Sequence, residues 1–258
     1  TYTPTAKDGY KFDHWEDNYP DNPYLYTVTA DTILRAVFVA ADFPVTVRSA
    51  NDMQGSVNPT VTNEDHTFKT SMSIQAVPET GYVFSHWTGK SGATIPGLPS
   101  SFTYIIEAVD TTFTAHFVPN KFYLNVLSSN PDWGTASPAS GDQTFGTTIT
   151  LSATPKLGYK FTDWSDGNSN SSRSYTIGAS NATITANFAK ADFPLTVNND
   201  GHGTTTPAGR NEYEYQSTVN ITATPSTGYE FSHWQNGDIN PSVSYYVVAD
   251  DSIYTAYF

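Results

Sequence analysis

Aromatic side chains are the groups in this sequence whose types and spacing best suit a binding chemistry. Five Trp, 17 Tyr and 15 Phe make up 14% of the 258 residues. Exposed rings can stack on sugars, and Tyr and Trp combine an apolar body with a polar group. The string Gly-Tyr-x-Phe-x-x-Trp occurs four times, as Gly9, Tyr10, Phe12 and Trp15; Gly81, Tyr82, Phe84 and Trp87; Gly158, Tyr159, Phe161 and Trp164; and Gly228, Tyr229, Phe231 and Trp234. We favour a core role for these residues, because burying Phe and Trp stabilises a small module, and expect the Tyr to be the most exposed.

Three further aromatic residues are candidates for contact with a glycan or a protein. Trp133 lies outside the repeated string, in a loop whose equivalents carry Gln54 and His202. Tyr213 and Tyr215 are the other two candidates, and coplanar exposed rings at these positions would favour glycan binding. The alternative for Trp133 is packing against the next module.

Three hydroxyl residues are candidates for O-glycosylation. Thr32, Thr111 and Ser252 each follow an Asp, in the order Asp-Ser/Thr-aliphatic or Thr that resembles the Bacteroidota-type acceptor pattern. The alternative is turn chemistry, since Asp and Thr side chains commonly bond to the backbone of a turn just before a strand. We favour the turn.

Metal and catalytic chemistry find little support in the sequence. His14, His86 and His233 recur once per repeat, whereas a metal site needs three or four converging ligands. The acidic loop 16–22 could offer oxygen ligands to Ca²⁺, but it lacks the Asp-x-Asp-x-Asp-Gly spacing, so we favour a polar turn. No nucleophile–base pair, phosphate loop or paired-carboxylate motif is present. We therefore expect no enzyme activity, no cofactor and no metal.

The elements that must position these residues are repeats. The Gly-to-Gly spacings of the string are 72, 77 and 70 residues, and each copy closes on Ala-x-Phe. These anchors predict four segments: residues 1–39 as the C-terminal half of a first repeat, then complete repeats at 40–119, 120–190 and 191–258. The half repeat cannot close the same core alone. Residues outside the chain or the neighbouring repeat must complete it, unless the segment simply begins within a repeat.

Each repeat is expected to be a small, mainly β module with little or no helix. The closing segments alternate with period 2, as in Phe113, Ala115 and Phe117, which is typical of a half-buried strand. We predict four or five short strands in a single sheet or a small sandwich. Phe and Trp of the string are three residues apart, so either a bulge lies between them or the Trp faces the other way.

Composition excludes several other classes. The chain has 37 Thr but only 8 Leu, which disfavours helical bundles, and the abundant aromatics disfavour disorder. A net charge of −13 makes nucleic acid a poor partner, and the absence of Cys removes disulfides. No apolar run approaches the roughly 20 residues that span a bilayer, so we expect no membrane insertion in this segment.

The ordered motif set resembles the divergent internalin-type B-repeat, also called the Listeria–Bacteroides or bacterial repeat. The resemblance covers nearly the whole chain and implies β-grasp-like modules of a secreted or surface-anchored bacterial protein. It implies an extracellular or cell-surface location and a role as a semi-rigid spacer or adhesive stalk, with a cell-surface glycan or protein as a possible partner. The alternatives are a carbohydrate-binding region of a secreted enzyme, or a fibre subunit that self-associates through the incomplete first repeat.

Overall fold

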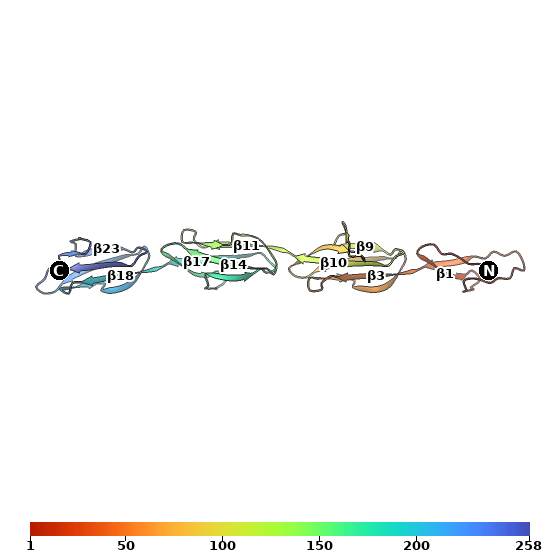
Figure 1. The fold of residues 1–258 in the computed structure, drawn as a ribbon, viewed down its shortest axis with the longest axis horizontal. Helices are drawn as coiled ribbons and strands as arrows, with labels where there is room; N and C mark the ends of the chain where they lie inside the picture. The colour runs from red at the N-terminus through yellow and green to blue at the C-terminus, as the bar shows by residue number, and fades with distance from the viewer. The chain divides into compact units, whose positions relative to one another are not determined.

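The structure, a computed structural model, describes residues 1–258 and consists of strands, turns and loops without a helix (Figure 1). It therefore contains no helix that could cross a membrane. The chain divides into two compact units, residues 1–121 with 144–146, and residues 122–143 with 147–258. The prediction of a mainly β chain is confirmed.

Each of the three complete repeats consists of two sheets. In the second repeat the larger sheet has the order β5-β3-β10-β7-β8 and the smaller one β4-β6-β9. The strands of this repeat are β3 (Asp42–Ser49), β4 (Gly55–Asn58), β5 (Val61–Thr67), β6 (Ser71–Pro78), β7 (Tyr82–Thr88), β8 (Thr94–Ile95), β9 (Ser101–Ile105) and β10 (Thr111–Pro119). The hydrophobic core contains residues from both sheets, which makes the repeat a small sandwich.

The third and fourth repeats have the same arrangement. The third contains β11 (Lys121–Ser128), β12 (Gly134–Ser137), β13 (Gly141–Thr144), β14 (Thr148–Pro155), β15 (Tyr159–Trp164), β16 (Ser172–Thr176) and β17 (Ala182–Lys190). The fourth contains β18 (Asp192–Asn199), β19 (Gly203–Thr206), β20 (Gly209–Glu214), β21 (Thr218–Pro225), β22 (His233–Trp234), β23 (Ser242–Tyr246) and β24 (Ser252–Tyr257). Their sheets have the orders β13-β11-β17-β15 with β12-β14-β16, and β20-β18-β24-β22 with β19-β21-β23.

The opening and closing strands of each complete repeat lie side by side and parallel. They are the pairs β3 with β10, β11 with β17, and β18 with β24. The repeats hold eight, seven and seven strands, more than the four or five predicted. The additional strands, such as β4, β8 and β12, are two to four residues long, too short to show a clear alternation in the sequence.

The Phe and Trp of the repeated string are core residues, as favoured from the sequence. Trp87, Trp164 and Trp234 have no exposed surface. Their partners in the string, Phe84, Phe161 and Phe231, pack against them with ring centroids 5.5–5.6 Å apart. The strand register shifts beside this pair in the second and third repeats, so the bulge is present and both rings face the core. Each buried indole donates its N–H to a loop carbonyl, at Pro99, Asn170 and Asn240, which satisfies its one polar group.

The first repeat has only two strands, β1 (Tyr10–Trp15) and β2 (Ala36–Ala40), which pair with each other. An isolated bridge joins Tyr2 to Tyr24. No strand pairs with the second edge of β2, which in a complete repeat is the edge that meets the opening strand.

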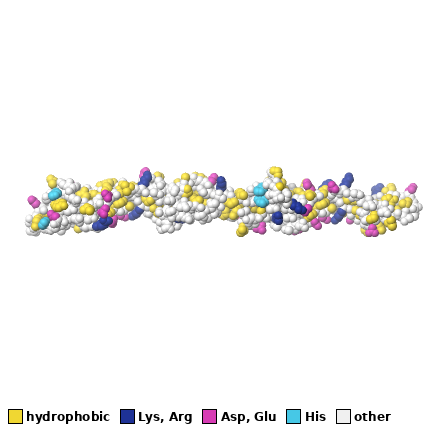
Figure 2. Space-filling view, in the orientation of Figure 1, with side chains coloured by type: hydrophobic (Ala, Val, Ile, Leu, Met, Phe, Trp, Pro, Cys, Tyr) yellow, Lys and Arg dark blue, Asp and Glu magenta, His cyan; other side chains and the backbone are white.

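Charged side chains of both signs are interspersed along the visible face in Figure 2, without a large patch of one sign.

Candidate functional site at the joints between repeats

Consecutive repeats are joined by a single residue that lies outside the strands. Ala41 separates β2 from β3, Asn120 separates β10 from β11, and Ala191 separates β17 from β18. Each linker N–H donates to the carbonyl oxygen of the string's Gly in the preceding repeat, at 2.9 Å to Gly9, 2.8 Å to Gly81 and 2.9 Å to Gly158. Each linker carbonyl accepts the N–H of an aromatic residue in the following repeat, at 2.9 Å from Phe68, 2.9 Å from Phe145 and 2.8 Å from Tyr215. Both backbone polar groups of every linker residue are thus paired.

The side chains of Phe68, Phe145 and Tyr215, which we call the joint rings, lie directly against the string's Gly. Gly9, Gly81 and Gly158 are buried and have φ of +87°, +89° and +89°. A Cβ at any of these positions would lie closer than 3.0 Å to the joint ring. Glycine is therefore required twice, for the positive φ and for the close approach of the ring. In the second joint, Gly81, Asn120 and Phe145 all belong to the first compact unit.

The Tyr after each Gly meets the same ring edge to face. The centroid distances are 5.5 Å for Tyr10 with Phe68, 5.5 Å for Tyr82 with Phe145 and 5.6 Å for Tyr159 with Tyr215, at interplanar angles of 78°, 79° and 81°. This T-shaped geometry is favoured by the charge distribution of aromatic rings. The string's Gly-Tyr therefore forms an acceptor for the joint ring, and we call it the acceptor dipeptide.

The joint ring is fixed to its own repeat by a tight turn. The residue after it has a positive φ, +64° at Lys69, +75° at Gly146 and +64° at Gln216. Each of these turns is anchored to a buried core residue by one hydrogen bond of 2.9 Å, from Ile106 N–H to the Thr70 carbonyl, from Ile177 N–H to the Thr147 carbonyl and from Val247 N–H to the Ser217 carbonyl. Movement of the ring is thus coupled to the core of the module that carries it.

Ion pairs cross two of the joints. Lys11 lies 3.3 Å from Asp42, and Lys160 lies 2.8 Å from Asp192. The hydrogen bonds that Asp42 accepts from Thr67 and Lys11 lower the pKa of its carboxyl. All four charged side chains are well exposed, so these pairs add little stability and mainly bias the orientation of the joint.

The acceptor dipeptides were identified from the sequence, but the joint rings were not identified as a set. The sequence suggests Tyr215 as a ligand candidate and suggests no such role for Phe68 or Phe145. The sequence does contain a pattern that could identify the joint rings. Each ring is the first residue of an aromatic-x-Ser/Thr triplet that lies 22 to 25 residues after the Phe of the opening strand. Pairing that triplet with a Gly in the preceding repeat requires the structure.

The three candidate ligand contacts are all half-buried. Trp133 stacks on Tyr159 of its own repeat, with centroids 5.2 Å apart and planes 16° apart. Tyr213 packs against the core of the fourth repeat, and Tyr215 is a joint ring. These contacts give each ring a structural role, and ligand contact stays a prediction for the ring faces that remain open.

The candidate glycosylation hydroxyls share a partner in the structure. Thr32, Thr111 and Ser252 lie 3.4, 2.9 and 2.5 Å from the hydroxyl oxygens of Tyr26, Tyr104 and Tyr245. Thr32 and Thr111 also donate to backbone carbonyls two residues earlier, as the turn interpretation expects. Thr32 is the exposed member of the three, so it is the most accessible to modification.

The His residues and the acidic loop do not form a metal cluster; no group of three or more potential ligands converges in the structure. His86 stacks on His116 with centroids 4.6 Å apart. Burial, and secondarily the neighbouring His86, lower the pKa of His116. In the acidic loop, Tyr24 donates to Asp17 at 2.8 Å, and this hydrogen bond raises the pKa of Tyr24 to about 12.

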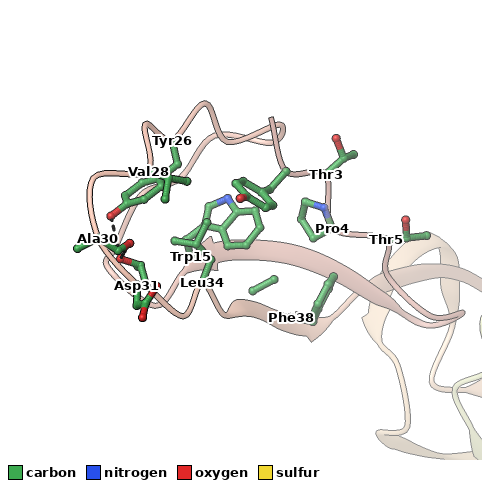
Figure 3. Close-up of a pocket in the computed structure, with 13 residues that line it drawn as sticks. Thr3, Pro4, Thr5, Trp15, Tyr26, Val28, Ala30, Asp31, Leu34 and Phe38 are labelled. Carbon is green, nitrogen blue, oxygen red and sulfur yellow. Dashed lines mark hydrogen bonds between the residues drawn. The ribbon is translucent and has the colours of Figure 1, made fainter.

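The first repeat contains a cavity of about 660 Å³. Figure 3 shows Trp15 at the centre of its lining, with Pro4, Leu34 and Phe38 nearby. Ala36 and Phe38 correspond to Ala115 and Phe117, which the rest of the second repeat buries. Phe38 is 36% exposed, against 5% for Phe117, so the cavity is the uncovered half of a module core.

A family model matches the three complete repeats. The family model of the divergent InlB B-repeat domain matches residues 45–121, 125–192 and 193–258. No curated protein matches the chain. Among solved structures, the Bacillus anthracis TIE protein is similar, at 10% identity and a TM-score of 0.39, over 88% of this chain and 54% of that one, so the chain spans about half its length. On the family match, which covers most of its length, the chain belongs to the divergent InlB B-repeat family.

Proposed function

We propose that this chain is a non-catalytic, semi-rigid spacer in a secreted or surface-anchored bacterial protein. The observation that carries the proposal is the joint, which recurs three times with the same hydrogen bonds and the same ring on the same acceptor dipeptide. A single linker residue with both backbone groups paired has little freedom to bend, unlike a flexible Gly/Ser linker. Family membership supports the extracellular location, since B-repeats are typical of surface proteins.

Small-angle X-ray scattering tests the spacer. A compact 258-residue domain would have a radius of gyration of about 18 Å, and we expect a clearly larger value that does not depend on concentration. Replacing the three joint rings, as F68S/F145S/Y215S, is expected to increase flexibility. Tyr246→Ser is the matched control, because Tyr246 is 54% exposed and outside the joints. A native value near 18 Å would contradict the spacer.

Self-assembly is the second candidate, and the first repeat favours it. Its cavity and the unpaired edge of β2 could take a strand from another chain by β-augmentation. Sedimentation velocity over a wide concentration range tests this, with Phe38→Asp placed in the cavity as the variant. Association that F38D abolishes would support it, and a monomer at every concentration would contradict it.

A further inference from the structure

The second repeat has a polar pocket on the side of its larger sheet that faces away from the core. Its volume is about 420 Å³, a size typical of small-molecule sites. Arg48 of β3, Thr114 of β10 and Thr88 of β7 form a row across three neighbouring strands and line this pocket. Both Thr are buried, although they alternate with the core residues of their strands, so they form the floor of the pocket.

Arg48 is the only arginine of the chain without a carboxylate partner. Arg35, Arg173 and Arg210 each pair with an Asp or Glu, in a chain whose 25 acidic residues outnumber its 12 basic ones. Arg48 instead donates from Nε to the Thr114 hydroxyl at 3.2 Å. This bond orients the guanidinium plane and leaves the two terminal nitrogens without a protein partner. Such a planar fork matches two oxygens of a carboxylate, sulfate or phosphate group.

Hydroxyl and imidazole groups surround this guanidinium. The Thr114 hydroxyl accepts from Arg48 and keeps its own proton to donate. His116 also lines the pocket, and its Nε2 lies 3.0 Å from the Thr88 hydroxyl. Stacking on His86 helps to hold the His116 ring in place. An oxyanion bound to Arg48 would therefore meet further hydrogen-bonding groups at the floor of the pocket.

Lys90 is the second cation of the pocket, and its charge is already compensated. Its ammonium group is paired with Asp110, which does not line the pocket. The unpaired positive charge is therefore that of Arg48. A bound anion would compete with Asp110 for Lys90, so the existing ion pair limits the affinity for an anion.

The walls of the pocket indicate what carries the acidic group. The pocket is larger than a bare anion, and its lining contains no Val, Leu, Ile, Met, Phe, Tyr or Trp. An aliphatic or aromatic acid would find little apolar surface to bury there. The hydroxyls of Ser49, Thr88 and Thr114 can instead form hydrogen bonds with the hydroxyls of a sugar.

The other complete repeats lack the arginine. Leu127 and Asn198 occupy the position of Arg48, and each pairs in register with the Thr that corresponds to Thr114. The guanidinium is thus a feature of the second repeat and is not required by the fold.

We propose that this pocket binds the acidic group of an anionic sugar, with the Arg48 guanidinium holding two oxygens of its carboxylate or sulfate. Thr88, Thr114 and His116 form hydrogen bonds with the rest of the group. This site goes beyond the proposed function, because a spacer does not need a ligand pocket.

NMR titration of the full chain at neutral pH and constant ionic strength tests the site. The probes are glucuronate, a sulfate ester of glucose, uncharged glucose and N-acetylglutamate. We expect glucuronate or the sulfated sugar to shift the resonances of Thr88, Thr114 and the His116 ring, and glucose to leave them in place. Response to neither acidic sugar, or equal response to glucose, would overturn the proposal. Tighter binding of N-acetylglutamate than of both acidic sugars would overturn the choice of a sugar.

Substitution of Arg48 separates the fork from general charge attraction. Arg48→Gln should weaken binding about 10- to 100-fold, because it removes charge-assisted hydrogen bonds. Arg48→Lys keeps the charge but loses the fork, so it should cause an intermediate loss. The matched control is Arg210→Gln, which changes the net charge equally in the fourth repeat and should leave the affinity unchanged. Native affinity in R48Q would contradict the site.

A gain in affinity cannot result from misfolding, so Asp110 provides the second test. Asp110→Asn releases Lys90 and should tighten binding of the acidic sugar. Asp251→Asn is the matched control, because Asp251 stands at the equivalent turn and pairs with Arg210. An equal gain in both variants would overturn the proposal, since it would show that the acidic sugars respond only to the overall charge of the chain.

Discussion

Gly158→Ala is the substitution that probes the joint most sharply, because the chain supplies its own control. Gly158 and Gly228 have nearly the same backbone conformation, with φ of +89° and +92°. Only Gly158 has a ring against it, from Tyr215. Forcing Ala into a positive φ costs about 1–2 kcal/mol at either position. The two substitutions therefore differ only in what happens to the joint ring.

At position 158 the new methyl group must displace Tyr215. That ring has two aromatic contacts, with Tyr159 at 5.6 Å and Phe193 at 5.9 Å. Each such pair contributes about 0.5–1.5 kcal/mol beyond its buried area. Losing both adds about 1–3 kcal/mol, which multiplies the equilibrium constant for opening of the joint by about 5–150.

Hydrogen exchange measures this difference residue by residue. The turn amides of Tyr159 and Tyr229 are equivalent reporters, donating to the carbonyls of Lys156 and Ser226 at 3.1 and 3.0 Å. Ala191 N–H reports the joint directly. We expect Gly158→Ala to accelerate exchange at Tyr159 and Ala191 more than Gly228→Ala accelerates it at Tyr229. Equal acceleration in the two turns, with Ala191 still protected, would refute the role of the ring.

Three other perturbations probe the rest of the account. Because the pKa of His116 is lowered, the unfolded chain binds its proton more readily, so the second repeat should lose stability as the pH falls below the ordinary value of 6.5. Denaturation at pH 7 and pH 5 checks this, and H86D/H116N, which grafts the residue pair of the third repeat, should remove the dependence. Trp164→Ala removes a side chain with no exposed surface and should cost about 3–5 kcal/mol, measured by denaturation of the third repeat; a loss below 1 kcal/mol would be inconsistent with a core role. The hydrogen bonds from Thr67 and Lys11 that lower the pKa of Asp42 stabilise the first joint at pH values above 3.8, the ordinary pKa of this carboxyl. This stabilisation should disappear as the pH falls through the lowered pKa. Hydrogen exchange corrected for intrinsic rates measures it, and Asp42→Asn should abolish the pH dependence.

The sequence was sufficient to predict the module and its core. A four-fold string with Trp at a fixed place, strands with period 2 and a Gly before each Tyr predict a small β unit, because these features act within one repeat. The spacing of Phe161 and Trp164 predicted either a bulge or a Trp that faces the other way, and the structure has the bulge, with both rings facing the core.

The joint was harder to predict, because its two halves belong to different repeats. The repeated string alone does not explain why position 158 needs a residue without a side chain. The reason is the ring of Tyr215, which lies against Gly158 in the structure. Trp133 illustrates the same difficulty, since an unrepeated Trp in a loop suggested ligand contact, while its stacking on Tyr159 depends on how the loop folds back. The parallel pairing of opening and closing strands likewise brings together residues more than 50 positions apart.

The most direct test of the semi-rigid joint is a distance distribution measured across one of them. The chain has no Cys, so spin labels can be placed at will, for instance at T154C and T224C, two exposed residues at the ends of the equivalent strands β14 and β21. Pulsed electron paramagnetic resonance should give one narrow distribution in the native chain and a broad one after Tyr215→Ser. A broad distribution in the native chain, unchanged by Y215S, would contradict the joint and the spacer built on it.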